Sequence, residues 1–241
     1  MNTKFWPSLT LAFALTGPAI AQLPPASDEY TSLKIIQTTA PGFPLRLRNS
    51  VVMEGDAWVV VRVDLNGQLT EWLVTGYTRR EFADTAVEAL KAWKYEPATI
   101  RGERWATVRE VRFNFSRSGV VVSQTGLETL DNYMERLMPN RQGFRAFKLR
   151  ELDRIPVPSK VVPPEYPESL AAKGVKGSVT VEFYIDPSGK VRMPGALKWT
   201  EQALAHLAVT AVEQWQFEPP VHDGQPVLVL VRQEFTFQPK F

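Results

Sequence analysis

The groups that could perform acid–base, nucleophilic or metal chemistry are few in this 241-residue chain. There is no cysteine, which excludes thiolate catalysis, disulfides, Cys-ligated zinc and iron–sulfur clusters. The only histidines are His206, expected on the surface of a predicted helix, and His222, expected to have a turn role in a His-Asp-Gly sequence. Ser178 and Ser188 have no histidine placed to activate them, and there is no G-x-S-x-G motif or Gly-rich phosphate loop. We therefore predict a protein that is not an enzyme and uses no cofactor or metal.

The charge balance also narrows the class of partner. Lys and Arg number 28 and Asp and Glu 26, which gives a net charge of +2. A dedicated nucleic-acid binder usually carries a large basic excess, so no nucleic acid is expected. With 44% apolar and 22% charged residues, the composition is that of a globular protein.

The N-terminus has the pattern of a secretory signal. Lys4 precedes an uncharged run over 5–20, which closes on Ala19-Ile20-Ala21, the small-x-small pattern of a cleavage site. The run contains Pro7 and Pro18 and is shorter than the roughly 20 residues of a membrane span. We predict a cleavable signal peptide over 1–21 and a soluble, periplasmic protein. The alternative is an uncleaved inner-membrane anchor.

The chain also repeats itself. The string WKYEP that starts at Trp93 returns as WQFEP at Trp215, an offset of 122 residues. The same offset superimposes the Asp-x-x-Gly motifs that begin at Asp64 and Asp186. It also aligns small helical residues and the paired phenylalanines near the end of each copy. A shared register over several unrelated motifs indicates a tandem, duplicated domain.

Each copy should be α+β, with a three-stranded antiparallel sheet and one or two helices on one face. In copy two, apolar residues alternate along 179–185, as in a half-buried strand, and the Asp186 turn leads to a second strand ending near Trp199. A helical face runs from Leu204 to Trp215 with Thr200 as its N-cap, and a third strand covers 227–237. A short helix is expected at 168–173.

Copy one follows the same plan with a less regular start. Its strands are predicted at 57–64, 69–76 and 105–115, and its helix packs a face that ends at Trp93. Residues 45–48 alternate like a strand, which leaves its first helix weak. The predicted domains are therefore 22–116 and 152–241, joined by a helical and basic linker over 117–151.

The linker has two parts. Apolar residues from Leu127 to Met138 predict an amphipathic helix that ends at Pro139. The basic residues Arg141, Arg145, Lys148 and Arg150 follow. A solvated surface explains these charges, and the alternative is contact with an acidic component of the envelope.

Copy two resembles the C-terminal domain of the TonB energy-transducer family. The resemblance rests on Pro163-Pro164-x-Tyr166-Pro167, the alternating strand from Gly177 to Gly189, Trp215-x-Phe217-x-Pro219 and Phe235. Copy one looks like a diverged member, with Phe43-Pro44 in place of Tyr166-Pro167.

The resemblance implies a protein-binding function in transmembrane transport. Such domains bind the TonB box, an extended peptide of outer-membrane receptors that serve, for example, siderophore uptake. The physical contact is strand addition to an open sheet edge. By the family's pattern the acceptor is the third strand, and the implied peptide-binding residues are Val227, Leu228, Val229, Leu230, Val231, Arg232, Pro164, Glu165 and Tyr166. The alternative is that the alternate valines are only core.

The chain departs from an energy transducer in its N-terminal half. Transducers of the family need a retained membrane helix and a long Pro-rich spacer, whereas the segment 22–44 spans at most about 80 Å. We expect a periplasmic binding or adaptor protein that recognises extended peptides of envelope partners. Two alternatives are a genuine membrane-anchored transducer and an envelope scaffold whose edges pair with themselves, as a homodimer or within one chain.

Three tryptophans of copy one have no counterpart in copy two: Trp58, Trp72 and Trp105. Trp58 falls out of phase with the apolar face of its strand. We expect these rings to form an interdomain interface, and the alternative is a separate ligand surface.

Overall fold

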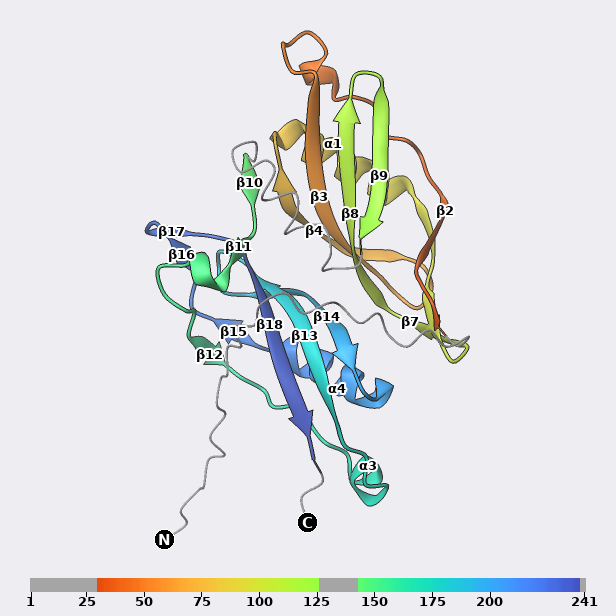
Figure 1. Ribbon diagram of the computed structural model, residues 1–241, viewed down its shortest axis with the longest axis vertical. Coiled ribbons are helices and arrows are strands. Elements are labelled where there is room, and N and C mark those ends of the chain that lie inside the picture. Colours follow the sequence, from red (N-terminus) through yellow and green to blue (C-terminus); the bar gives the residue numbers. More distant parts are fainter. Residues whose placement is uncertain (1–29, 126–142, 239–241) are drawn as a thin grey trace.

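The computed structural model describes residues 30–125 and 143–238 and shows an α+β fold with many strands and few helices. Two units lie end to end (Figure 1). We call residues 30–125 the first unit, 149–238 the second unit and 143–148 the connecting segment. The predicted signal peptide and the predicted linker helix over 127–138 lie outside the described residues.

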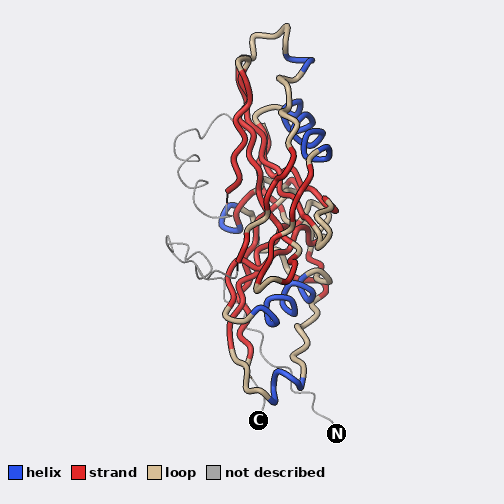
Figure 2. Tube along the Cα trace, turned by 90° about the vertical axis from the view of Figure 1, so that its right-hand side faces the viewer, coloured by secondary structure: helices blue, strands red, loops and turns tan. Residues whose placement is uncertain are grey.

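The first unit is built on a five-stranded sheet in the order β10-β4-β3-β8-β9. Helix α1 lies against one face of this sheet (Figure 2). The main elements are β3 (Glu54–Val63), β4 (Leu69–Tyr77), α1 (Arg80–Ala92), β8 (Thr107–Ser116) and β9 (Gly119–Thr125). Shorter ones are β1 (Tyr30–Thr31), β2 (Lys34–Gln37), η1 (Leu45–Leu47), β5 (Lys94–Glu96), β6 (Ala98–Ile100) and β7 (Glu103–Trp105).

The second unit has a four-stranded sheet in the order β11-β18-β13-β14, with α4 on one face. Its main elements are β13 (Gly177–Ile185), β14 (Val191–Trp199), α4 (Gln202–Val212) and β18 (Val229–Phe237). Shorter ones are η2 (Leu149–Glu151), β12 (Pro158–Lys160), α3 (Glu168–Ala172), β15 (Gln216–Phe217), β16 (Val221–His222) and β17 (Gln225–Pro226). The connecting segment supplies β10 (Phe144–Arg145) and β11 (Phe147–Lys148).

The predicted periodicities explain both cores. Val59, Val61 and Val63 of β3 face α1, and in β13 the alternating residues from Val179 to Ile185 face α4. Trp93 and Trp215, which follow the two helices, are 5% and 3% exposed, as predicted for core residues. Their indole N–H groups donate to the carbonyl oxygens of Thr39 and Val162, at 2.9 and 2.7 Å.

The two Asp-x-x-Gly turns form as predicted. Oδ1 of Asp64 accepts the backbone N–H groups of Asn66 and Gln68, both at 2.8 Å. Oδ1 of Asp186 accepts those of Ser188 and Lys190, at 2.9 and 3.1 Å. Each aspartate thus holds its own hairpin turn, and no catalytic role is needed to explain its position.

Three pairs of corresponding elements begin at an offset of 122 residues, and β3 and β13 begin 123 residues apart. β4 and β14 start at Leu69 and Val191, and α1 and α4 at Arg80 and Gln202. β8 and β18 start at Thr107 and Val229. β2 pairs with β5 in the first unit, as β12 pairs with β15 in the second.

Four details differ from the sequence-based expectation. Both sheets exceed three strands, because β9 and the two connecting strands add to their edges. Strand β9 falls within the predicted linker over 117–151, since Arg117 and Ser118 make a tight turn that returns the chain along β8. Residues 45–47 form a 3-10 helix rather than a strand. Thr200 does not cap α4, because its hydroxyl accepts the backbone N–H of Ser178.

None of the helices within 30–125 and 143–238 combines the length and the apolar character needed to cross a membrane.

Candidate functional site

Strand β18, the predicted peptide acceptor, has one side chain face in the core. Val229 and Val231 are buried among the residues under α4, at 0% and 5% exposure. On the opposite face Arg232 donates through Nε to the carboxylate of Glu182, at 2.7 Å. The valines therefore serve the core, and only the backbone edge of β18 can receive a further strand.

The first half of that edge is already paired within the chain. Phe147 and Lys148 of β11 lie parallel to Val229 and Leu230, and the N–H of Phe147 donates to the carbonyl oxygen of Leu228 at 2.8 Å. The edge predicted over Val227–Arg232 is thus not open at its start. The reason is that the connecting segment continues from an edge of one sheet to an edge of the other. Just before β11, β10 pairs with β4 at Phe144 and Tyr77.

The direction of the backbone N–H and C=O groups in the second half of the edge follows from the pairing of β18 with β13. The carbonyl oxygen of Ser178 accepts the backbone N–H of Thr200 and the N–H of Ser178 donates to the Thr200 hydroxyl, both on the side of β13 that faces β14. Ser178 is also the antiparallel partner of Thr236, so this pair is not hydrogen-bonded and the N–H and C=O of Thr236 point outward. By the strand's alternation Glu234 has the same orientation. No strand within the described residues pairs with this side of β18 beyond Leu230.

The residues predicted to flank this edge take different positions. The Tyr166 ring lies 6.1 Å from that of Phe237 between centroids, and its hydroxyl donates to the carbonyl oxygen of Val175. Tyr166 therefore sits at the end of β18. Half-buried Pro164 and exposed Glu165 lie in the segment between β12 and α3. Strand β12, which precedes that segment, pairs with β15 and not with β18.

The equivalent edge of the first unit is covered. Strand β9 pairs with β8 along its whole length, from Ser116 opposite Gly119 to Glu110 opposite Thr125. In β8 the covered residues run from Glu110 to Ser116, whereas in β18 the residues after Leu230 have no partner strand on this side within the described chain.

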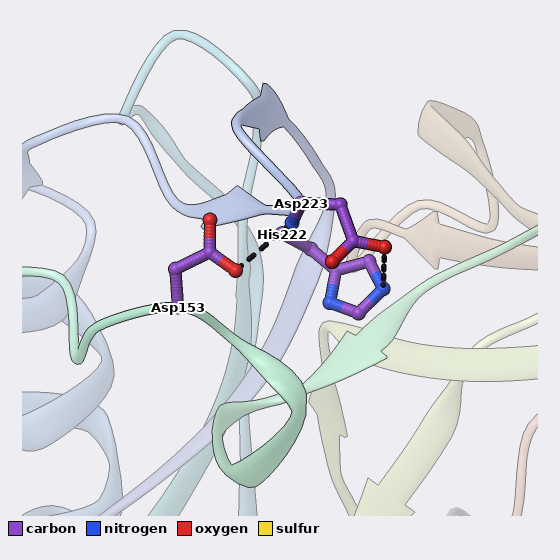
Figure 3. Close-up of side chains that lie close together, drawn as sticks. All are labelled: Asp153, His222 and Asp223. Atoms are coloured by element: carbon purple, nitrogen blue, oxygen red, sulfur yellow. Dashed lines mark hydrogen bonds and ion pairs between the residues drawn. The ribbon is translucent and has the colours of Figure 1, made fainter.

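Asp153, His222 and Asp223 lie close together where η2 meets the β16–β17 hairpin (Figure 3). Both oxygens of Asp153 accept backbone N–H groups, from Gly224 and Asp223 at 2.9 Å each, and the bond from Gly224, followed by that from Asp223, lowers the pKa of Asp153. The Nδ1 atom of His222 bonds the carbonyl oxygen of Glu151, and its ring lies 4.4 Å from that of Phe147. These hydrogen bonds hold Glu151 and Asp153 against the hairpin, and the ring contact adds Phe147 of the connecting segment, in agreement with the predicted turn role of His222.

The two units meet through side chains that the sequence did not single out. Val60 of β3 packs in a buried cluster with Tyr184, Met193 and Leu228 of the second unit. One signal was available, because Val59, Val60 and Val61 are consecutive, which indicates a strand buried on both faces. All three are 0% exposed.

Ion pairs surround this apolar contact. Nη1 of Arg62 lies 2.8 Å from the carboxylate of Glu213, and Nη2 lies 3.3 Å from the carbonyl oxygen of Pro194. Nε of Arg192 donates to Glu71 at 2.7 Å. Each pair joins one unit to the other, so the charges fix their relative orientation.

The three predicted interface tryptophans separate. Trp105 packs against the core of the second unit, and its ring lies 6.4 Å from that of exposed His206 on α4. Trp58 lies over Gly76, on the face of β3 that also carries Val60. Trp72 lies elsewhere: its ring stacks under the ammonium of Lys91, within the first unit.

Comparisons with known proteins locate similarity in the second unit. Residues 162–239 match the family model described as Gram-negative bacterial TonB protein C-terminal. Protein TonB of Vibrio cholerae serotype O1 (strain ATCC 39315 / El Tor Inaba N16961) is 31% identical over 77 residues, which cover 32% of each chain. The chain thus matches about a third of the length of this curated relative. Among solved structures, the Pseudomonas aeruginosa TonB CTD, determined by solution NMR, is 28% identical. That alignment covers 39% of this chain and 94% of the other, with a TM-score of 0.33.

Proposed function

We propose that this protein is a periplasmic binding or adaptor protein, built from two tandem TonB-C-like domains, that captures extended peptide segments of envelope partners by strand addition. The similarity of residues 162–239 to TonB C-terminal domains supports a role connected with transport across the outer membrane. The matching offsets of β4, α1 and β8 with β14, α4 and β18 support an origin by duplication.

The observation that carries the proposal is the partly unpaired edge of β18. The backbone groups of Glu234 and Thr236 point away from β13, and beyond Leu230 no described strand covers them. A peptide in extended conformation completes such an edge with main-chain hydrogen bonds. Because β11 holds the first half, the peptide would pair with Arg232–Phe237 or displace β11.

The test is titration of the full chain with a synthetic TonB-box peptide of an outer-membrane receptor. Thr236→Pro removes one outward N–H and should weaken binding at least about tenfold, whereas Thr236→Val keeps the N–H and should bind normally. Equal affinity of both variants, at equal thermal stability, would exclude strand addition at this edge.

One observation favours a second function, an envelope scaffold whose edges pair with themselves. Strand β11 shows that β18 already accepts a strand of its own chain. In that case no TonB-box peptide should bind at millimolar concentration, and the protein should form a stable self-paired dimer or remain a closed monomer.

The membrane-anchored transducer remains the third candidate. The mass of the exported protein separates it from the adaptor: loss of the first 21 residues supports a cleaved signal peptide, and an intact N-terminus supports an anchor.

A further inference from the structure

The first unit carries a cleft of about 290 Å³ where the β3–β4 turn meets the C-terminal end of α1. Its walls include Ile36, Gln68, Trp72, Lys91 and Trp93, all from the first unit. Strand β18 belongs to the second unit, so a ligand in this cleft does not depend on strand addition.

The cleft is cationic. Nζ of Lys91 lies 4.3 Å from the centroid of the Trp72 ring, and Lys94 also lines the cleft. Neither lysine has a carboxylate partner among the described residues, and both are exposed. No acidic residue of the described chain lines the cleft, and nearby Asp64 uses its Oδ1 to accept the backbone N–H groups of Asn66 and Gln68. A carboxylate of a ligand would therefore meet uncompensated positive charge.

The cleft is also apolar and open at its rim. Trp72 is 38% exposed and Ile36 is 61% exposed. Large apolar side chains beside charged ones are typical of protein-binding surfaces, where tryptophan often contributes most of the affinity. The Trp72 ring offers a flat contact that its stacked lysine leaves partly open.

The second unit shows how the same corner of the fold is used. At the 122-residue offset, Pro194 stands for Trp72 and Glu213 stands for Lys91. There Arg62, from the other unit, bonds both the Glu213 carboxylate and the Pro194 carbonyl oxygen. This corner of the second unit therefore holds a cationic side chain of a neighbouring sheet. In the first unit the charge is reversed, so the matching occupant is an acidic side chain.

We infer that the cleft binds a short acidic peptide segment of a protein partner. A carboxylate lies between Lys91 and Lys94, and an adjacent apolar side chain rests on Trp72. The volume lies at the lower end of the range for ligand pockets and is sufficient for one or two peptide side chains.

The test is an NMR titration of the full chain with acetyl-Gly-Glu-Leu-Asp-Gly-amide, followed at the indole N–H of Trp72. The uncharged peptide acetyl-Gly-Gln-Leu-Asn-Gly-amide is the control ligand. The acidic peptide should shift the Trp72 signal and bind at least about tenfold more tightly than the uncharged one. Raising the salt concentration should weaken it, because both the lysines and the carboxylates are exposed.

Two variants and a matched control assign the site. Lys91→Glu and Trp72→Ser should each weaken the acidic peptide at least about tenfold. The second unit already has glutamate at the position of Lys91, so the fold accepts this change, and thermal unfolding verifies it. Lys173→Glu makes the same charge change on an exposed lysine at the end of α3 and should leave binding within about twofold.

Several results would overturn the inference. They are equal affinity for both peptides, an equal loss in Lys173→Glu, and no Trp72 shift at about 5 mM peptide. A dimer that dissociates in Lys91→Glu, without peptide binding, would instead assign the cleft to a second copy of this chain.

Discussion

At the scale of single residues, Gly189 is a position where the backbone leaves no room for a side chain. It lies in the left-handed region with φ of +85°, and a Cβ would fall 2.0 Å from the carbonyl oxygen of Phe217. The backbone explains this closeness, since the N–H of Phe217 donates to the carbonyl oxygen of Gly189 at 2.9 Å. The hairpin turn is thus held against β15, directly after the core residue Trp215.

We predict that Gly189→Ala destabilises the protein by more than about 2 kcal/mol, through the left-handed backbone and the clash together. Gly174→Ala is the matched control. It has φ of +63° but no atom within 4 Å of the added Cβ, so only the backbone cost of about 1–2 kcal/mol applies. Chemical denaturation of both variants measures the difference, and equal losses would show that the contact with Phe217 relaxes without cost.

The side chain of Glu151 binds two residues of the connecting segment, Arg145 and Lys148. Its carboxylate accepts two hydrogen bonds from Arg145, of which the longer is 3.0 Å, and the backbone N–H of Lys148 at 2.8 Å. The bonds from Arg145, followed by that from Lys148, lower the pKa of Glu151. Because the folded pKa is lowered, this stabilisation is present above the pKa of the unfolded chain. It is lost as the pH falls through the folded value.

At the scale of elements, Glu151 holds β11 in place on β18 through the backbone N–H of Lys148. We predict that the amide signal of Lys148 titrates with a midpoint below the ordinary pKa of a glutamate. In Arg145→Met the midpoint should rise, and in Arg150→Met it should not, because no hydrogen bond joins Arg150 to Glu151 among the described contacts. NMR spectra recorded across the acidic pH range measure the midpoint in the unaltered protein and in both variants. An unchanged midpoint in Arg145→Met would exclude the guanidinium as the cause.

The elements that sequence could predict are those with local signals. Strand β13, the short helix α3 and the Asp64 and Asp186 turns follow from alternation, a proline start and Asp-x-x-Gly spacing. Strands β10 and β11 have only two residues each, and their pairing partners are 67 or more positions away in the sequence. No periodicity exists at that length, so tertiary pairing alone determines them.

The candidate edge was therefore only partly predictable. The sequence indicated that the alternate residues Val229 and Val231 belong to a strand with one core face. It could not show that Leu228 to Leu230 are paired with the connecting segment, because that depends on how the two units are placed. The sequence also could not show that Trp72 stacks with Lys91, because Lys91 comes from the end of α1.

At the scale of the whole molecule, the two units share a buried contact rather than a flexible joint. Val60 lies between the sheets, whereas its neighbour Val61 faces α1, and both side chains are 0% exposed. Because units of this size bury a smaller fraction of their surface than larger domains do, we expect the contact between them to add to stability. The two valines allow the interface to be separated from the local core with identical chemistry.

We predict that Val60→Ala and Val61→Ala each cost about 2 kcal/mol, since each removes two buried methyl groups. The losses should be distributed differently. Val61→Ala should reduce amide-exchange protection mainly in β3, β4 and β8 of the first unit. Val60→Ala should also reduce it in β13 and β14, because Tyr184 and Met193 lose a contact. Native-state hydrogen exchange on the full chain measures this. If Val60→Ala affected the first unit alone, the units would fold independently and Arg62 and Glu71 would only orient them.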